Sequence, residues 1–188
     1  MDIYVDATTL IALGNVGQLE LLLDFDGQIV ITPRVASEVS AEPARTNLDQ
    51  FGQRSGVRRR PRSALSEATL TEAKDLLGDS ELNGDAEVIA GVLVGVQRSS
   101  MDRRKGTSVA SLVAVVSDDR RVRTVAESLG ATVTGTIGVI VRAVHEGTDP
   151  DEAKKLVRRL DSQGLHMTGE LRETAYRLVE DAAKENDE

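Results

Sequence analysis

The chain contains no cysteine and no tryptophan, and its only histidines are His145 and His166. The absence of cysteine excludes a disulfide framework, a cysteine–zinc site and a thiol nucleophile. Two isolated histidines argue against a histidine-rich metal centre. With only two tyrosines and two phenylalanines in the chain, we expect an aliphatic core. For the same reason, we do not expect nucleic acid to bind by stacking of its bases on an aromatic platform.

Long hydrophobic runs are also missing. No apolar run reaches the roughly 18 residues that suggest a membrane-spanning helix. No basic segment follows Met1-Asp2, so a secretory leader is not expected. We therefore predict a soluble, cytoplasmic protein with no membrane partner. Its 188 residues are enough for a compact fold that needs no metal or disulfide for stability.

The chain has few basic residues relative to acidic ones. It carries 31 acidic and 23 basic residues, a net charge of −8, and 18 of the basic residues are arginine. An acidic, lysine-poor chain is typical of proteins that stay hydrated in a salt-rich cytoplasm. The acidic balance also argues against general coating of DNA, which requires a strongly basic surface.

The apolar residues predict strands that alternate with helices. Strands are expected over residues 3–5, 29–31, 109–116 and 131–133, and helices over 7–13, 18–24, 34–40, 66–77, 86–96, 120–129, 136–145, 150–163 and 169–184. A hydroxyl cap from Thr32 is expected to begin the third helix, with Pro33 in its first turn. Residues 43–63 form the least regular stretch, and residues 98–108 are expected to form a polar loop. The alternation predicts an α/β fold with a mostly parallel sheet.

Acidic residues follow two of the predicted strands. Asp6 comes directly after the first strand, and Asp118-Asp119 follow the longest one. The carboxyl ends of parallel strands share one edge, where open α/β sheets bind ligands, so these side chains should meet there. Glu38 and Asp85 lie on helices that can face the same edge. Each carboxylate alone also has a simpler explanation, as a helix cap or a solvated side chain.

Carboxylates that are crowded together repel one another unless a cation neutralises them. Oxygen ligands without cysteine or a nearby histidine favour Mg²⁺ or Mn²⁺. Such a site is suited to phosphodiester hydrolysis, because the metal activates water and stabilises the leaving oxygen. Thr8 or Thr9, just beyond Asp6, can hydrogen-bond a ligand or a water there.

The acidic residues lie in four segments, in the order Tyr4–Leu10, Ile31–Val39, Asn83–Ala90 and Val115–Arg120. Together these segments resemble the PIN domain, the fold of the VapC-type toxin ribonucleases and related nucleases, over about residues 2–145. Thr134–Gly138 and the helical tail are similar to a prokaryotic PIN subgroup with a C-terminal helical extension. The resemblance implies a PIN-like three-layer α/β/α sandwich, with a nuclease domain at 1–147 and a helical extension at 148–188.

The resemblance also assigns roles to residues. It implies that the catalytic metal ligands are Asp6, Glu38, Asp85 and Asp119, with Asp118 as the alternative to Asp119. Many relatives in the subgroup carry Glu at the position of Asp85. Glu87 is a spare candidate that the helix turns away from Asp85, and Thr8 stands where the family often has Ser or Thr near the metal.

The function implied by this resemblance is a Mg²⁺- or Mn²⁺-dependent endoribonuclease acting on RNA. The same resemblance suggests the toxin half of a toxin–antitoxin pair, with a small antitoxin protein as partner, and a homodimer. A non-catalytic PIN module that binds nucleic acid or protein through the same edge is the alternative. A phosphoacceptor receiver domain is set aside, because Asp6 lacks a paired acid and no suitable lysine follows Val133.

Arginines give local positive charge within this acidic chain. Those expected to hold RNA phosphates are Arg54, Arg58, Arg59, Arg60, Arg62 and Arg120. Phosphate contacts of this kind position a nucleic acid without reading its sequence. A solvated loop or helix surface is the alternative explanation for the basic segments, and concentrated salt would weaken such contacts.

Overall fold

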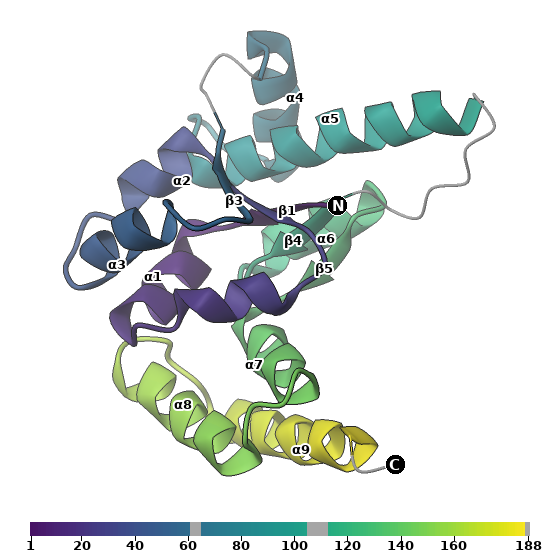
Figure 1. The fold of residues 1–188 in the computed structure, drawn as a ribbon. Helices are drawn as coiled ribbons and strands as arrows, with labels where there is room; N and C mark the ends of the chain where they lie inside the picture. The colour runs from purple at the N-terminus through teal and green to yellow at the C-terminus, as the bar shows by residue number, and fades with distance from the viewer. Residues whose placement is uncertain (61–64, 105–112, 187–188) are drawn as a thin grey trace.

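A computed structural model describes residues 1–60, 65–104 and 113–186, except the side chains of residues 99–104. Its sheet has five strands in the order β3-β2-β1-β4-β5, and each neighbouring pair is parallel (Figure 1). The strands are β1 (Asp2–Val5), β2 (Gln28–Ile31), β3 (Val57–Arg59), β4 (Val113–Val116) and β5 (Thr132–Thr134). From β1 the chain adds β2 and then β3 on one side, and it later adds β4 and then β5 on the other side of β1. The strand order therefore reverses between β1 and β4, the position where open α/β sheets bind ligands.

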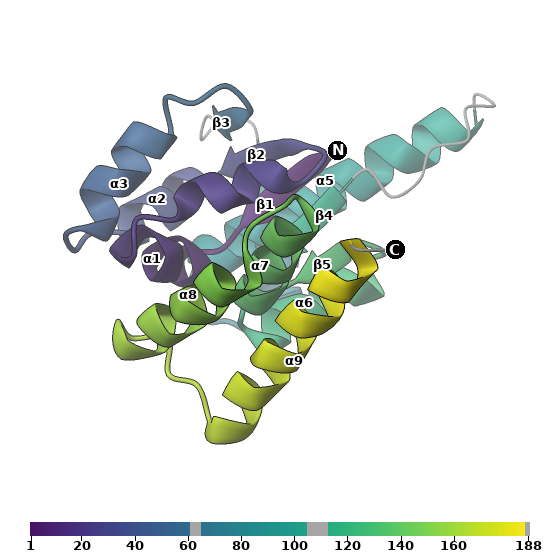
Figure 2. The same cartoon turned by 60° about the horizontal axis from the view of Figure 1, so that its bottom comes forward.

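Helices cover both faces of this sheet and complete the expected α/β/α layers. Those on one face are α4 (Glu67–Leu77), α5 (Gly84–Arg104) and α6 (Arg120–Ser128), with α2 (Pro33–Glu38) against α5. Those on the other face are α1 (Ala7–Asn15), the 3₁₀ helix η1 (Leu19–Asp24) and α7 (Thr136–His145), with α3 (Ala44–Phe51) against α1. Figure 2 shows the two layers from a second side.

The core is mainly aliphatic, as the shortage of aromatic residues predicts. Ile3 and Val5 of β1 are buried, and all four residues of β4 are buried. Tyr4 is an aromatic exception in the centre of the sheet, with 1% of its surface exposed. Gly91 of α5 makes room for it, since a Cβ there would lie 2.3 Å from Cε1 of Tyr4.

Two segments expected to be irregular contain regular structure. Residues 43–63 include α3 and the edge strand β3, and α5 continues to Arg104 through the first part of the expected loop at 98–108. The helix expected at 18–24 is a 3₁₀ helix. Of the strand expected at 109–116, residues 109–112 lie outside the described part of the chain.

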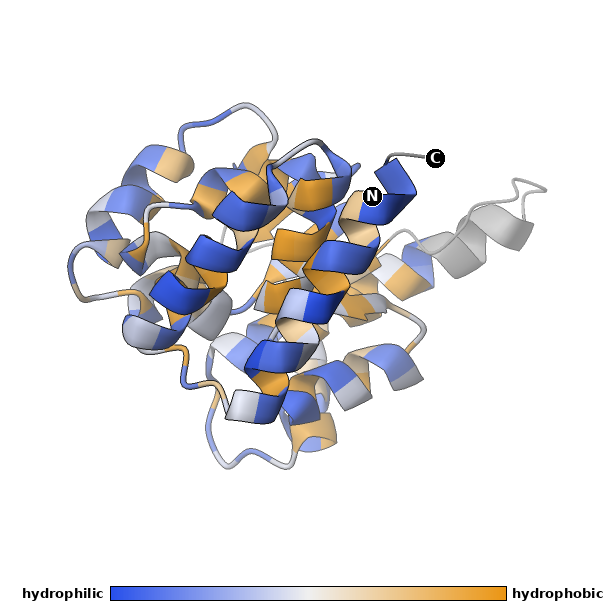
Figure 3. Cartoon of the chain, turned by 90° about the horizontal axis from the view of Figure 1, so that it is seen from below, coloured by the Kyte–Doolittle hydropathy of each residue, from blue (hydrophilic) through white to orange (hydrophobic). Residues whose placement is uncertain are grey.

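The last two helices, α8 (Pro150–Ser162) and α9 (Gly169–Asn186), pack against α7 and against each other. Their buried residues join the core cluster of the sheet and its helices. Figure 3 shows hydrophilic residues prevailing on the outer surface of this pair and hydrophobic residues gathered behind it. Within the described residues, no helix is both long and apolar enough to cross a membrane.

Candidate metal centre

The end of β1 and the end of β4 meet at the switch point of the sheet. Val5 is in register with Val116, and the backbone N–H of Asp6 donates to the carbonyl oxygen of Val116 at 3.1 Å. The hydroxyl of Ser117 then donates to Oδ2 of Asp6 at 2.5 Å. Residues separated by more than a hundred positions in the chain therefore share one hydrogen-bonded edge, as the parallel sheet predicts.

Asp6 both caps a helix and lies in the centre of this edge. Its Oδ1 accepts a 2.7 Å hydrogen bond from the backbone N–H of Thr9, at the start of α1. Only 1% of Asp6 is exposed. Burial raises the pKa of this carboxyl, and the hydrogen bonds from Ser117 and Thr9 oppose that rise. The capping explanation is therefore correct for Asp6, but it does not account for the burial of a carboxylate beside other acids.

The two acids after β4 point to different places. Asp118 accepts from the backbone N–H of Thr136 at 2.9 Å and from its hydroxyl at 2.5 Å, at the start of α7. Asp119 caps α6, and its Oδ1 accepts from the backbone N–H of Arg121 at 2.6 Å and of Val122 at 3.2 Å. The hydrogen bonds to Thr136 hold Asp118 near the end of β5, where its charge acts on Asp6, whereas the charge of Asp119 acts on Asp85.

Asp85 shows which acids are gathered at this edge. Its pKa is raised from 3.8 to about 6, first by burial and then by the negative charges of Asp6, Asp119 and Glu38. The attraction of Arg121 only partly offsets these effects. The structure thus brings the four predicted carboxylates, from β1, α2, α5 and the end of β4, into one electrostatic cluster.

Glu38 is the last residue of α2, and its side chain belongs to this cluster. Its Oε1 accepts a 2.7 Å hydrogen bond from the backbone N–H of Gly84, the first residue of α5. A Cβ at Gly84 would lie 2.7 Å from Oε2 of Glu38, so glycine permits the close approach of this carboxylate. The neighbouring residue is Asp85, and the contact therefore fixes Glu38 beside it.

Arg121 is a member of the site that the sequence pattern did not single out. Its guanidinium lies 3.5 Å from Oδ2 of Asp85 and also pairs with Asp79. It donates to the carbonyl oxygen of Leu77 at 3.3 Å. A cation from α6 therefore neutralises part of the negative charge, and the side chain of Asp85 is drawn toward it.

The chemistry of the donor set fits a hard divalent cation, because every acid in the cluster offers carboxylate oxygens. The oxygens are not gathered around one point, however. Among the described residues, no three acidic or histidine side chains lie in an arrangement that would hold a metal ion. Each of three carboxylates is hydrogen-bonded to a different part of the fold: Asp6 to Ser117 and Thr9, Glu38 to Gly84, and Asp119 to the first turn of α6.

Comparison with known proteins identifies the family of this chain. A family model described as a PIN domain matches residues 2–181, nearly the whole chain. The chain belongs to the PIN-domain family. No curated protein and no solved structure gives a match. In this PIN domain the acidic cluster lies at the switch point of a nuclease-type fold.

Two other predicted residues of the PIN domain lie away from the cluster. Glu87, the spare candidate, is buried; its Oε2 accepts from the backbone N–H of Arg34 at 2.8 Å and its Oε1 lies 3.5 Å from Nε of that arginine. Glu87 therefore supplies the cap of α2 that Thr32 was expected to supply, since the hydroxyl of Thr32 makes no capping bond. Thr8 is exposed, and it is the backbone of Thr9 that contacts Asp6.

The predicted phosphate-binding arginines divide between the two edges of the sheet. Arg54, ahead of β3, pairs with Glu20, and Arg58 pairs with Asp2 at the start of β1. Both lie toward the amino ends of the strands, away from the acidic cluster. Arg59 ends β3 and Arg60 follows it, at the carboxyl edge.

The two remaining arginines complete this set. Arg120 is exposed in the first turn of α6, one residue from Asp119. Arg62 lies outside the residues that the structure describes. Of the six arginines predicted to hold phosphate, Arg59, Arg60 and Arg120 are thus the described ones at the edge where the acids gather.

Proposed function

We propose that this PIN domain is a metal-dependent endoribonuclease. The observation that supports this most is the raised pKa of Asp85, to about 6, which reflects burial beside three further carboxylates. A fold gains nothing in stability from gathering four acids at one edge, and such perturbed groups concentrate at functional sites. A divalent cation is the partner that makes this arrangement favourable.

In this proposal the cation, Mg²⁺ or Mn²⁺, is held by Asp6, Glu38, Asp85 and Asp119. When bound it acts as a Lewis acid that activates water and stabilises the leaving oxygen of an RNA phosphodiester. The chain supplies the orientation. Ser117 and the backbone N–H of Thr9 hold the carboxylate of Asp6, and the backbone N–H of Gly84 holds that of Glu38. Arg121 balances the charge of Asp85 until the cation binds.

The finer role that we propose is that of a cytoplasmic toxin. A small antitoxin protein would then cover the carboxylate edge and block access of RNA. Production of the chain in a bacterial host should arrest growth, and the Asp6→Asn variant should not. A homodimer also stays a prediction; Leu171 and Leu178 of α9 are exposed and lie on one helix face.

The direct test of the ribonuclease is cleavage of labelled RNA pools by the purified chain. We expect cleavage with Mg²⁺ or Mn²⁺, none with a chelator, and a loss of at least about 100-fold in the Asp6→Asn and Asp85→Asn variants. Circular dichroism should show that both variants are folded. Equal rates in the three proteins would refute the four-carboxylate mechanism. Binding of RNA without cleavage in any pool would support the non-catalytic module instead.

A further inference from the structure

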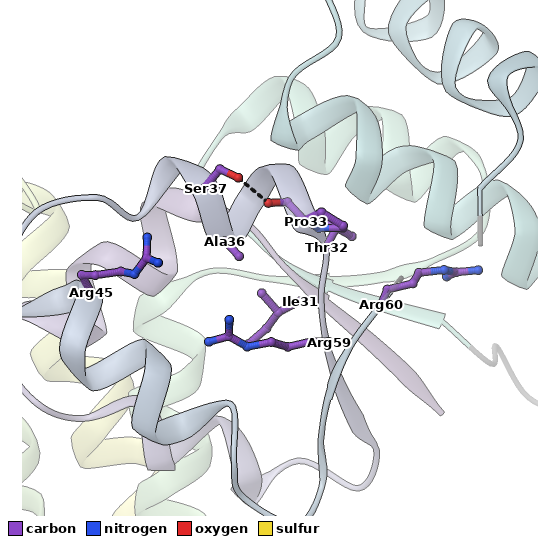
Figure 4. A pocket seen from close by; sticks show the side chains of 8 residues that line it. All are labelled: Ile31, Thr32, Pro33, Ala36, Ser37, Arg45, Arg59 and Arg60. Atoms are coloured by element: carbon purple, nitrogen blue, oxygen red, sulfur yellow. Dashed lines mark hydrogen bonds between the residues drawn. The ribbon is translucent and has the colours of Figure 1, made fainter. Parts of the chain in front are cut away.

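A second site lies beside the acidic cluster, at the carboxyl ends of β2 and β3. A cavity of about 360 Å³ opens there between the strand ends and the helices α2 and α3 (Figure 4). Its lining residues are Ile31, Thr32, Pro33, Ala36, Ser37, Arg45, Arg59 and Arg60. Three of these are arginines and none is acidic.

Two guanidinium groups border this arginine cavity. Nε of Arg45 donates to Oδ2 of Asp49 at 3.1 Å, and Nη2 of Arg59 donates to Oδ1 of the same carboxylate at 2.8 Å. Arg59 also donates to the carbonyl oxygen of Leu48 at 3.3 Å. Asp49 therefore orients both groups and neutralises one of the two charges. Each guanidinium has five N–H donors, and most of them have no acceptor among the described residues.

Arg60 has a different role in the wall of the cavity. Figure 4 shows its side chain directed away from those of Arg45 and Arg59. Its guanidinium donates to the hydroxyl of Tyr4 and lies 5.7 Å from the centre of that ring. Arg60 is 93% buried, with 7% of its surface exposed. It thus fixes the end of β3 against the core and adds positive charge behind the cavity.

Thr32 supplies an independent observation. Only 1% of this residue is exposed, and its hydroxyl has no hydrogen-bond partner among the described residues. The hydroxyl is not needed as a helix cap, because Glu87 accepts from the first turn of α2 instead. Buried hydroxyls are nearly always paired, and an unpaired one calls for an explanation. Thr32 lines the cavity, so a ligand oxygen bound there would supply the missing partner.

We propose that the arginine cavity binds a backbone phosphate of the same RNA strand that is cleaved at the acidic cluster. A guanidinium fork matches the oxygens of a phosphate, and the hydroxyl of Thr32 adds a neutral donor. The cavity shares Pro33 and Ser37 with a second hollow of about 280 Å³, which Glu38 and Asn83 line. The two hollows therefore lie on either side of α2. In the proposal, one RNA strand crosses this helix and contacts both sites. This inference rests on the proposed ribonuclease activity.

The test measures binding of a fluorescein-labelled single-stranded RNA to the full chain, with a chelator present so that cleavage does not interfere. We expect Arg45→Gln and Arg59→Gln each to weaken binding about tenfold, as loss of a charged hydrogen bond does. Each should also lower the slope of log affinity against log salt by about 0.7. Arg172→Gln is the matched control: it removes one ion-paired arginine of α9 that is not among those expected to hold RNA phosphates and should leave affinity unchanged.

Gly52→Ala tests the geometry without changing any charge. Gly52 has a φ of −61°, which alanine also adopts, but a Cβ there would lie 2.6 Å from Nε of Arg59. The flexible side chain of Arg59 would move, and we expect weaker RNA binding with thermal stability close to that of the parent chain. Thr32→Val should weaken binding as well, by removing the neutral donor.

Several outcomes overturn the inference or separate it from the ribonuclease proposal. If Arg45→Gln and Arg59→Gln bind RNA as Arg172→Gln does while the parent chain cleaves RNA, the cavity is not a phosphate site and the ribonuclease stands. If they bind weakly but the parent cleaves no RNA, the cavity stands and the ribonuclease fails. If inorganic phosphate raises the melting temperature of the parent but not of Arg59→Gln, and RNA affinities are equal, the cavity takes free phosphate and the RNA assignment is wrong.

Discussion

Single carboxylates in this chain serve two purposes at once. Asp6 caps α1 and Asp119 caps α6, and both also belong to the acidic cluster. A sequence pattern that identifies a cap therefore cannot exclude a ligand. Asp118 and Asp119 are adjacent and chemically identical, and they differ in their contacts: Asp118 accepts from Thr136 and acts on Asp6, whereas Asp119 caps α6 and acts on Asp85.

The raised pKa of Asp85 predicts how stability changes with pH in the absence of divalent metal. In the folded chain Asp85 binds its proton up to about pH 6, against 3.8 for an ordinary aspartate. The folded state thus holds more protons than the unfolded state between these values, and the free energy of unfolding falls as pH rises through them. Asp85→Asn should remove the contribution of Asp85 to this fall, leaving that of Asp6, and should stabilise the chain at neutral pH by roughly 1–2 kcal/mol.

Chemical denaturation of both proteins at acidic and neutral pH provides the measurement. The pH of both series should stay above that at which ordinary aspartates protonate. A parent chain whose stability does not fall more than that of Asp85→Asn between about pH 4.5 and 7 would contradict the predicted electrostatic cluster.

Added cation should reverse this penalty. Because Mn²⁺ would bind the folded carboxylates and not the unfolded chain, it should raise the free energy of unfolding by about 2.7 kcal/mol at 100 times its dissociation constant. Asp6→Asn should lose most of that gain. The comparison of melting temperatures with Mn²⁺ and with chelator tests this without any substrate. An equal rise in both proteins would mean that the metal binds elsewhere.

Among the elements, those with a clear apolar pattern were predictable even when short, whereas β3 and α3, which lie in polar sequence, were not. The strands at the centre of the sheet follow from runs of apolar residues, as in Val113–Val116. The edge strand β3 has three residues, two of them arginine, and owes its structure to pairing with β2. Helix α3 buries only Ala44, Leu48 and Phe51 in a polar sequence. The arginine cavity lies between these two elements, so sequence alone could not locate it.

The close packing of α5 on β1 predicts that one added methyl group at Gly91 lowers the free energy of unfolding. Gly91→Ala would place a Cβ 2.3 Å from the buried ring of Tyr4. Neither the ring nor the helix has space to move, and we expect a loss of about 1–3 kcal/mol in the free energy of unfolding. Gly169→Ala is the control, because nothing lies within 4 Å of its Cβ. Similar denaturation midpoints for the two variants would show that Tyr4 is not tightly held.

At the scale of the whole molecule, net charge says little about the substrate. The chain carries −8 overall, yet its topology separates the signs along one edge. Four carboxylates lie at the switch point between β1 and β4, and arginines lie at the ends of β2 and β3. The sequence predicted that Asp6 and Asp119 meet at that edge, because each follows an apolar run that marks the end of a strand. It could not assign the arginines, because ion pairs with Glu20, Asp2 and Asp49 depend on tertiary contacts.

The division at residue 147 can be tested on the same scale. Helices α8 and α9 pack on α7, and the side chain of Asn186 donates to the carbonyl oxygen of Val144 at 2.7 Å. Removal of residues 148–188 would expose the apolar face of α7, which packs against them. We expect a truncated chain that aggregates or melts well below the full chain in a thermal scan. A truncated chain with the melting temperature of the full chain would show that the two parts are independent.

The central claim is that the carboxylates at the switch point form a nuclease centre, and two helix caps offer the most direct test. Asp119 accepts from the backbone N–H groups of Arg121 and Val122, and Asp149 accepts from those of Asp151 and Glu152 in the same way at the start of α8. Asp119→Asn and Asp149→Asn therefore remove one negative charge from equivalent caps and leave an amide oxygen that still accepts the capping hydrogen bonds, but only Asp119 lies in the acidic cluster. We predict that Asp119→Asn loses Mn²⁺-dependent RNA cleavage by at least about 100-fold while Asp149→Asn cleaves at the parental rate. Equal cleavage rates in the two variants would contradict the account.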